Sequence, residues 1–241
     1  MISPEQLQES FDQVSTRPIE YRCRANLNLY DSPICTRLAT QAAVGRHLQI
    51  LSRTLGDDAL EVRLCEDSYS GWLSVKDITE IEPTETTYQA IALSRPEIQN
   101  RLPQVIAFTL EAMNQPNYYL WGGTVGPNYD CSGLMQAAFG ASGIWLPRDS
   151  YQQAAFTQLI QPEELLPGDL IFFGTPEKVD HVGLCIGDGC YIHSSGTEIG
   201  RNGIGIDQLS EQGDEISQSY YRRLHSCGRV MENYQPSLGK G

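Results

Sequence analysis

The chain has 241 residues, and its 30 Asp and Glu residues outnumber its 17 Lys and Arg residues, which gives a formal net charge of −13. The acidic excess is spread along the chain. Neither half therefore has the basic surface of a nucleic-acid-binding protein, and an anionic membrane surface would repel both. We expect no nucleic-acid and no membrane partner. Hydrophobic residues make up 40% of the chain, enough for one large domain or two smaller ones.

The first ten residues contain no basic residue and no apolar run, unlike a secretory signal peptide. No segment reaches the length of a membrane span. The seven cysteines are an odd number, and reduced thiols are the simplest interpretation in a chain without an export signal. We therefore predict a cytoplasmic protein, and the sequence does not indicate an oligomeric state.

The N-terminal third contains segments of partial polar–apolar alternation separated by turn residues, a pattern typical of short strands. They lie at 25–30, 44–51, 59–64 and 71–75. Several short strands at this spacing predict a small β-barrel, which we assign to residues 1–85. The polar stretch from Glu80 to Thr87, with Pro83, is typical of a linker. Residues 86–102 are assigned to the linker and the start of the first helix.

The remaining residues, 103–235, predict a domain of mixed helices and strands. Apolar residues recur at helical spacing between Arg95 and Asn114, and Pro103 predicts that the firm helix begins there. Asp130 is a favourable N-cap for a second helix that ends near Gly140. Strands are predicted at 169–173, 181–186 and 190–194. Helices followed by antiparallel strands indicate the α+β fold class.

One cysteine has the surroundings expected of a nucleophile. Cys131 follows the glycine-rich loop 121–128 and would be the first residue of the helix capped by Asp130, where backbone N–H groups and the helix dipole stabilise a thiolate. An imidazolium at His181 would lower the pKa of the thiol further. Because such a thiol needs a base and an orienting third group, we predict His181 as general base and His193 as orienting residue.

The two histidines can be placed on one predicted hairpin. A three-residue loop, 187–189, would set residue 183 opposite residue 193. His181 and His193 would then be diagonal neighbours on one face, roughly 7–8 Å apart between backbones. A two-residue loop would put them on opposite faces. The sequence therefore predicts a three-residue loop, with His193 hydrogen-bonded to the far ring nitrogen of His181.

A structural zinc site is the competing interpretation, because His181, Cys185, Cys190 and His193 are zinc-type ligands. Residues 190 and 193 are three apart on one predicted strand and point to opposite faces. A regular hairpin cannot bring all four side chains to one ion, so we expect no metal and no cofactor. The other six cysteines, together with His47 and His225, are interpreted as structural.

Six ordered sequence blocks, over about residues 100–232, resemble the NlpC-type cell-wall cysteine peptidases, a papain-like family. The blocks are Tyr119-Leu120-Trp121-Gly122-Gly123, Asp130-Cys131-Ser132-Gly133-Leu134, Arg148-Asp149-Ser150, Leu166-Pro167-Gly168-Asp169-Leu170, Asp180-His181-Val182-Gly183 and Tyr191-Ile192-His193. The resemblance implies a catalytic set of Cys131, His181 and His193 that cleaves peptidoglycan stem peptides. The N-terminal strands, with Gly71-Trp72-Leu73, resemble a bacterial SH3-like domain.

The two-domain layout is similar to that of γ-D-glutamyl-L-diamino acid endopeptidases, especially the cyanobacterial type. The resemblance implies hydrolysis of the γ-D-Glu–diaminopimelate bond in peptides with a free N-terminal L-Ala. It implies substrate contacts by a set of polar and aromatic side chains: Tyr69, Tyr119, Trp121, Asp130, Ser132, Asp149 and Ser150. Arg148 is an alternative receiver of a substrate carboxylate. An acid of the small domain, Asp31, Glu66 or Asp67, would meet the substrate ammonium.

The backbone N–H of Cys131 is a candidate for the oxyanion hole. Together with the absence of an export signal, the resemblance predicts an enzyme that trims imported or recycled muropeptides. Two alternatives remain open. One is an amidase or acyltransferase that acts on another amide with the same residues, and the other is a non-catalytic protein that binds wall fragments.

Overall fold

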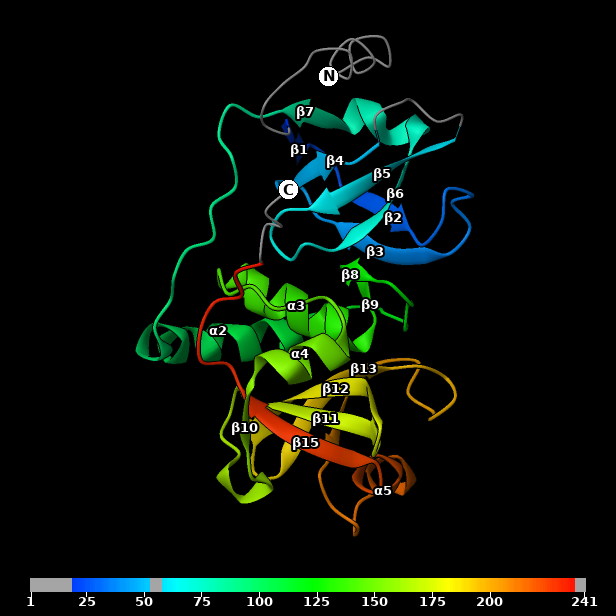
Figure 1. Ribbon diagram of the computed structural model, residues 1–241. Coiled ribbons are helices and arrows are strands. Elements are labelled where there is room, and N and C mark those ends of the chain that lie inside the picture. The colour runs from blue at the N-terminus through cyan, green and yellow to red at the C-terminus, as the bar shows by residue number, and fades with distance from the viewer. Residues whose placement is uncertain (1–18, 53–57, 237–241) are drawn as a thin grey trace. The chain divides into compact units, whose positions relative to one another are not determined.

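The computed structural model describes residues 19–52 and 58–236 and divides into two compact units. The first unit comprises the described residues up to Ala90 and those from Gln235, and the second spans Ile91–Tyr234. A sheet of short strands forms the first unit, and helices with a second antiparallel sheet form the other (Figure 1). The predicted α+β class is confirmed.

Seven strands form the antiparallel sheet of the first unit in the order β3-β2-β6-β5-β4-β1-β7. They are β1 (Glu20–Cys23), β2 (Leu27–Tyr30), β3 (Leu38–Ala42), β4 (His47–Ile50), β5 (Ala59–Leu64), β6 (Ser70–Ser74) and β7 (Ile81–Pro83). The four strand segments predicted from sequence correspond to β2, β4, β5 and β6. Alternate side chains point inward and form one core that includes Leu29, Leu48, Leu60 and Leu73.

The stretch predicted as a linker contains regular structure at its start. Val75–Glu80 forms the 3-10 helix η1, and β7 pairs antiparallel with β1. Pro83 is the last residue of an edge strand, where the missing N–H removes no ladder hydrogen bond. Ile81 is fully buried in the core of the unit. This burial keeps the stretch in the sheet although its neighbours are polar.

A six-stranded antiparallel sheet in the order β10-β15-β11-β12-β13-β14 organises the second unit. Its strands are β10 (Gln158–Ile160), β11 (Leu170–Thr175), β12 (Lys178–Gly187), β13 (Cys190–Ser195), β14 (Gly203–Gln208) and β15 (Leu224–Arg229). The other elements are α2 (Arg95–Met113), β8 (Thr124–Val125), β9 (Asn128–Tyr129), α3 (Cys131–Ala141), α4 (Ser150–Phe156), η2 (Pro162–Glu164) and α5 (Glu215–Tyr221). Helices α2, α3 and α4 lie on one side of the sheet, whereas α5 contacts β14 (Figure 1).

Different side chains bury the two faces of this sheet. On β11, Leu170 and Phe172 belong to the core beneath α2 and α3, whereas Ile171 and Phe173 belong to a second cluster that contains Tyr220 of α5. Such alternation follows from the two-residue period of a strand. A sheet buried on both faces holds its strands firmly, and it therefore provides a rigid support for side chains at its edge.

Helix α2 begins earlier than Pro103 suggests. Ser94 and Glu97 form a capping box, and Pro96 lies in the first turn, where its missing N–H is harmless. Pro103 lies inside the helix and removes one interior hydrogen bond. The flanking residues Leu102 and Val105 are buried in the core. Tertiary packing and a strong N-terminal cap thus override the proline.

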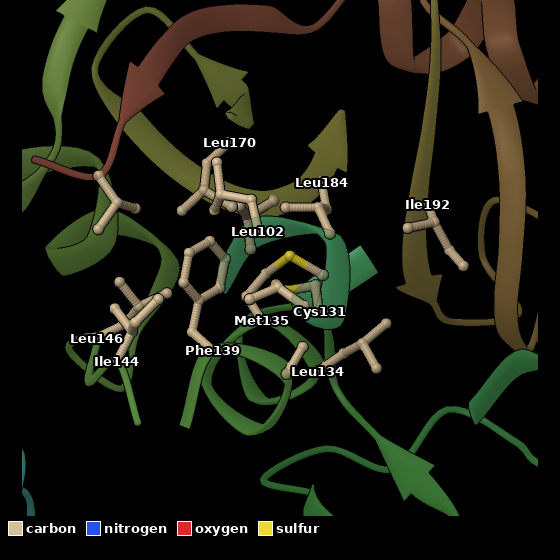
Figure 2. Packing of buried hydrophobic residues seen from close by; sticks show 14 of the residues in the cluster. Leu102, Cys131, Leu134, Met135, Phe139, Ile144, Leu146, Leu170, Leu184 and Ile192 are labelled. Carbon is tan, nitrogen blue, oxygen red and sulfur yellow. The ribbon is translucent and has the colours of Figure 1, made fainter. Parts of the chain in front are cut away.

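Helix α3 begins where the sequence predicts, with Asp130 as N-cap. Its apolar side packs Leu134, Met135 and Phe139 against α2 and the sheet (Figure 2). The helix also lies against the loop that precedes it. A Cβ atom at Gly133 would be 1.9 Å from the carbonyl oxygen of Gly123, so only glycine fits at this position.

Replacing Gly133 by Ala should therefore destabilise the protein by about 1–3 kcal/mol, because the loop or the helix must move. Gly140 in the same helix is a matched control, since a Cβ there would lie 3.9 Å from the nearest ring atom of Trp145. Gly140→Ala should be neutral or stabilise by up to about 1 kcal/mol through helix propensity. Thermal unfolding of both variants measures this, and equal melting temperatures would contradict the close contact.

Candidate active site

The hairpin of β12 and β13 brings His181 and His193 together. Leu184 pairs with Ile192, the register that sets residue 183 opposite residue 193. His181 Nε2 and His193 Nδ1 are 2.7 Å apart. The predicted hydrogen bond between the two imidazoles is therefore present, and His181 Nδ1 remains for another partner.

The tip of the hairpin differs from the predicted three-residue loop. Gly187 pairs with Cys190, so the turn itself has two residues, Asp188 and Gly189, and Ile186 forms a bulge. Both turn residues have positive φ, 51° and 69°, as in the type I′ turn whose twist matches that of the flanking strands. The bulge adds back the one residue that the shorter turn removes, and both histidines stay on one face.

A buried carboxylate lies behind His193. Asp207 Oδ2 is 2.7 Å from His193 Nε2. Asp207 lies on β14, where its neighbour Gly205 pairs with His193, so the two side chains are diagonal neighbours on one face. Arg201 donates to both oxygens of Asp207, at 3.2 Å from Nε to Oδ2 and through a short contact from Nη2 to Oδ1.

Cys131 is the first residue of α3, and its side chain is buried. The backbone N–H groups of Ser132 and Val182 donate to its sulfur, and the second of these belongs to the residue that follows His181. These donors favour the thiolate. Burial nevertheless dominates and, together with the charge of Asp130, raises the pKa of the Cys131 thiol to about 12.

The expected imidazolium beside this thiol is not supported. Burial, His193 and Arg223 hold the pKa of His181 well below 6.5. Burial also lowers the pKa of His193, although Asp207 opposes the shift. Tyr220 stacks on His181 with 4.6 Å between ring centroids and an interplanar angle of 30°, which helps to exclude water. Burial thus favours a neutral thiol and a neutral base at rest over a preformed ion pair.

Asp130 holds the start of α3, the preceding loop and Arg148 together. Its carboxylate accepts hydrogen bonds from the backbone N–H of Gly133 at 2.6 Å and of Gly122 at 2.9 Å. Arg148 donates at 2.6 Å and 3.2 Å, and it also donates to Ser132 Oγ at 3.0 Å. Because Arg148 is buried and both of its amino groups have partners, a substrate carboxylate would have to share them.

Other residues predicted to contact substrate lie at several places. Tyr119 and Trp121 line a cavity of about 390 Å³ beside His181, together with Tyr220 and Arg223. Burial, followed by the charges of Cys131 and Asp130, raises the pKa of Tyr119 far above its usual range, so its hydroxyl remains a hydrogen-bond donor. The role of the aromatic pair in substrate binding stays a prediction.

Asp149 is the N-cap of α4 and Ser150 is its first residue. Tyr69 lies in the first unit, in the turn between β5 and β6, and its backbone N–H donates to Asp67 at 3.0 Å. Substrate contacts by these residues stay predictions.

Two of the acids proposed to meet the substrate ammonium are engaged within the first unit. Arg46 lies 3.1 Å from Glu66 and 3.0 Å from Asp67, and all three side chains are buried. Asp31 is more exposed and lies 3.6 Å from Arg37. Two carboxylates against one guanidinium leave the buried group with a net negative charge. The choice among the three acids stays a prediction.

All seven cysteines lie in the described part of the chain, and all are free thiols. Among residues 19–52 and 58–236, no group of three or more His, Cys, Asp and Glu side chains is placed to hold a metal ion. Within the same residues, no helix is long and apolar enough to cross a membrane.

Two parts of the chain match models of known families. Residues 116–223 match the model of the NlpC/P60 family, and residues 29–78 match that of the bacterial dipeptidyl-peptidase SH3 domain. The unit that carries the candidate site contains an NlpC/P60 domain. The first unit contains a bacterial SH3 domain, as the resemblance predicted.

Curated proteins match part of this chain within longer sequences. The chain is 42% identical to the γ-D-glutamyl-L-lysine dipeptidyl-peptidase of Bacillus subtilis (strain 168) over 82 residues, 33% of this chain and 28% of that protein. It is 34% identical to the bifunctional muramidase/DL-endopeptidase CwlT of the same strain over 131 residues, 52% of this chain and 36% of that protein. The matches thus span about a third or less of each relative's length.

A solved structure of an NlpC/P60 family protein from Bacillus cereus ATCC 10987 aligns with a TM-score of 0.46 at 24% identity, covering 92% of this chain and 66% of that chain. The structure of the peptidoglycan hydrolase RipB from Mycobacterium tuberculosis aligns with a TM-score of 0.46 at 25% identity, covering 58% and 69%.

Four residues of the candidate site were not predicted from the sequence: Arg201, Asp207, Tyr220 and Arg223. A signal for Asp207 exists in the alternating stretch Gly203-Ile204-Gly205-Ile206-Asp207. The usual interpretation would point the isoleucines inward. The structure instead buries Gly203, Gly205 and Asp207 and leaves Ile206 37% exposed, because a Cβ atom would lie 2.5 Å from Asn117 Oδ1 at Gly203 and 3.0 Å from the Arg201 side chain at Gly205.

The buried histidines predict a pH dependence of stability. The pKa values of His181 and His193 are lower in the folded protein than the ordinary 6.5, so below that pH the unfolded chain binds more protons. Each histidine should then remove up to about 1.4 kcal/mol of unfolding free energy per pH unit below 6.5. Urea unfolding at pH 7.5, 6.5 and 5.5 measures this loss.

The variants His181→Gln and His225→Gln separate this effect from general acid sensitivity. His225 is exposed, so its replacement should leave the pH dependence unchanged, whereas His181→Gln should flatten it. Equal slopes for the two variants would contradict a buried neutral His181.

Proposed function

We propose that this protein is a cysteine endopeptidase that hydrolyses the γ-D-Glu–diaminopimelate bond of peptidoglycan stem peptides with a free N-terminal L-Ala. The observation that carries the proposal is the buried Cys131 beside the hydrogen-bonded pair of His181 and His193 in an NlpC/P60 domain. The dipeptidyl-peptidase names of the SH3 model and of a relative support a free N-terminus on the acyl side.

In this proposal His181 Nδ1 takes the proton of Cys131 as the sulfur attacks the γ-carbonyl carbon. Proton transfer during attack fits a thiol and an imidazole that are both neutral at rest. The backbone N–H of Cys131, at the positive end of α3, and the hydroxyl of Tyr119 are donors for the oxyanion. His181 then returns the proton to the leaving amine, and water hydrolyses the thioester by the reverse roles.

The charged residues of the cavity beside His181 support a leaving amino acid that carries both a negative and a positive charge on its side chain. Because His181 protonates the leaving nitrogen, the residues next to it face the amine-side product. Arg223 Nη2 donates to both oxygens of Asp180, at 2.6 Å and 2.8 Å, and no described residue accepts a hydrogen bond from its Nε or Nη1. Glu198 lies in the same cavity wall. A guanidinium and a carboxylate together suit an amino acid with a second carboxylate and a second ammonium.

The first test compares the protein and its Cys131→Ala variant on L-Ala-γ-D-Glu-diaminopimelate and on the same peptide with an acetylated N-terminus. We expect release of diaminopimelate from the free peptide only, and only by the protein that retains the thiol. Equal cleavage of both peptides would remove the requirement for a free amine. Failure to cleave either would move the assignment to another amide or to binding without catalysis.

Arg223→Gln tests the leaving-group cavity. At pH 8, where His181 is neutral in both proteins, kcat/KM for the diaminopimelate peptide should fall about tenfold or more, because a charge-assisted hydrogen bond is lost. The matching lysine peptide lacks the second carboxylate and serves as the control, with little expected change. An equal loss on both peptides would show that Arg223 acts on His181 or on folding.

We further propose that the protein is located in the cytoplasm. Seven free thiols, several of them buried in the cores of the two units, support a reducing environment such as the cytoplasm. There the enzyme would trim imported or recycled muropeptides. Fractionation of cells with an antibody against the protein tests this location, and recovery outside the cytoplasm would contradict it.

A further inference from the structure

The chain of buried polar groups does not end at His193. Asp207 is 3% exposed, and its carboxylate accepts hydrogen bonds from three directions. His193 Nε2 lies 2.7 Å from Oδ2, Arg201 contacts both oxygens, and Ser217 Oγ lies 3.3 Å from Oδ1. Such a carboxylate is costly to bury unless its partners are fixed, so the site maintains a specific arrangement here.

The protonation state of Asp207 determines which ring nitrogen carries the proton in each of the two histidines. Hydrogen bonds and positive charge from His193 and Arg201 outweigh burial and lower the pKa of Asp207 to about 2. An ionised carboxylate can only accept hydrogen bonds, so His193 Nε2 must carry a proton. Neutral His193 then has an unprotonated Nδ1, which accepts from His181 Nε2–H. His181 is thereby left with a free base at Nδ1.

We propose that Asp207, held by Arg201, is a positioning residue that fixes both histidines in the tautomers that leave His181 Nδ1 unprotonated. Asp207 touches neither the thiol nor the cavity beside His181, and it acts through two hydrogen bonds in series. For the kinetic readout this inference rests on the proposed peptidase function, whereas the tautomers exist in the resting protein without substrate.

Arg201 helps to hold the carboxylate of Asp207 in place. Its guanidinium joins Asp207 to Asp214, the N-cap of α5, at 3.2 Å. It thereby ties β14 to the helix whose Tyr220 stacks on His181. The titratable and charged groups around the two histidines are Asp207, Arg201, Asp214, Arg223, Tyr191 and Tyr220.

The variant Asp207→Asn isolates the proposed role because it keeps the shape of the side chain. An amide can donate as well as accept. When its NH₂ faces His193 Nε2, His193 must carry its proton on Nδ1 and donate to His181 Nε2. The free base of His181 is then lost from Nδ1. The NMR ¹⁵N shifts of the ring nitrogens of the four histidines report these tautomers directly.

We expect Asp207→Asn to shift the ring ¹⁵N signals of both His193 and His181 and to lower kcat/KM by about 10²-fold or more, up to the loss of about 10⁴-fold that follows when a buried orienting carboxylate is neutralised. Asp214→Asn is the matched control. It also contacts Arg201 but not His193, and Asn is an equally good N-cap, so the histidine signals and kcat/KM should stay near those of the wild type.

Arg201→Gln gives a second measurement if Asp207→Asn folds poorly. The charge of Arg201 lowers the pKa of His193, so its removal should move the acid limb of kcat/KM to higher pH. Unchanged tautomers with lost activity in Asp207→Asn would reduce Asp207 to a structural role. Changed tautomers with kcat/KM within threefold of the wild type would overturn the positioning role, as would an unmoved acid limb in Arg201→Gln.

These readouts also separate this inference from the proposed function. Absence of peptide hydrolysis by the wild type would count against the proposed substrate, while the ring ¹⁵N signals of the unliganded protein would still decide the tautomers.

Discussion

The second unit depends most on the hydrogen bonds and the ion pair made by the carboxylate of Asp130. It caps α3, holds the loop through Gly122 and neutralises the buried guanidinium of Arg148. Each of these groups would be costly to bury alone, and together they fix the position of the sulfur of Cys131. The same negative charge raises the pKa of that thiol. The residue that positions the proposed nucleophile therefore also opposes its ionisation.

This opposition explains the character of the site. Burial stabilises the neutral forms of Cys131 and His181, so separation of charge waits until a substrate is present. Stacking of Tyr220 on His181 and the buried faces of the sheet exclude water from the imidazoles. A thiol that stays protonated at rest is also less open to oxidation, because the thiolate is the reactive form. The thiol of such a site is unreactive until substrate binds.

Local patterns predicted those parts of the molecule that depend on local physics. The N-cap at Asp130 and the hydrogen bond between His181 and His193 follow from helix capping and strand alternation, and both are present. Pro103 misled the sequence analysis because packing on both sides of it outweighs one lost hydrogen bond. The role of Asp207 could not be predicted, because its contact with His193 needs a strand whose inward face carries glycines and not isoleucines. Such an inversion is decided by the side chains of Asn117 and Arg201, which occupy the space beside Gly203 and Gly205, and alternation alone does not reveal it.

The bulge at Ile186 has a consequence for how this hairpin can vary among related sequences. The two-residue turn and the bulge together count as three residues between paired positions, and this count sets the parity of β13 relative to β12. If the bulge were absent and Ile186 paired with Tyr191, Leu184 would lie opposite His193. His193 would then share the face of Leu184 and lose its link to His181, although every side chain named in the site would still be encoded. A one-residue deletion here should be tolerated only if the bulge is lost with it. The bulge thus constrains the site as strictly as the identity of the histidines themselves.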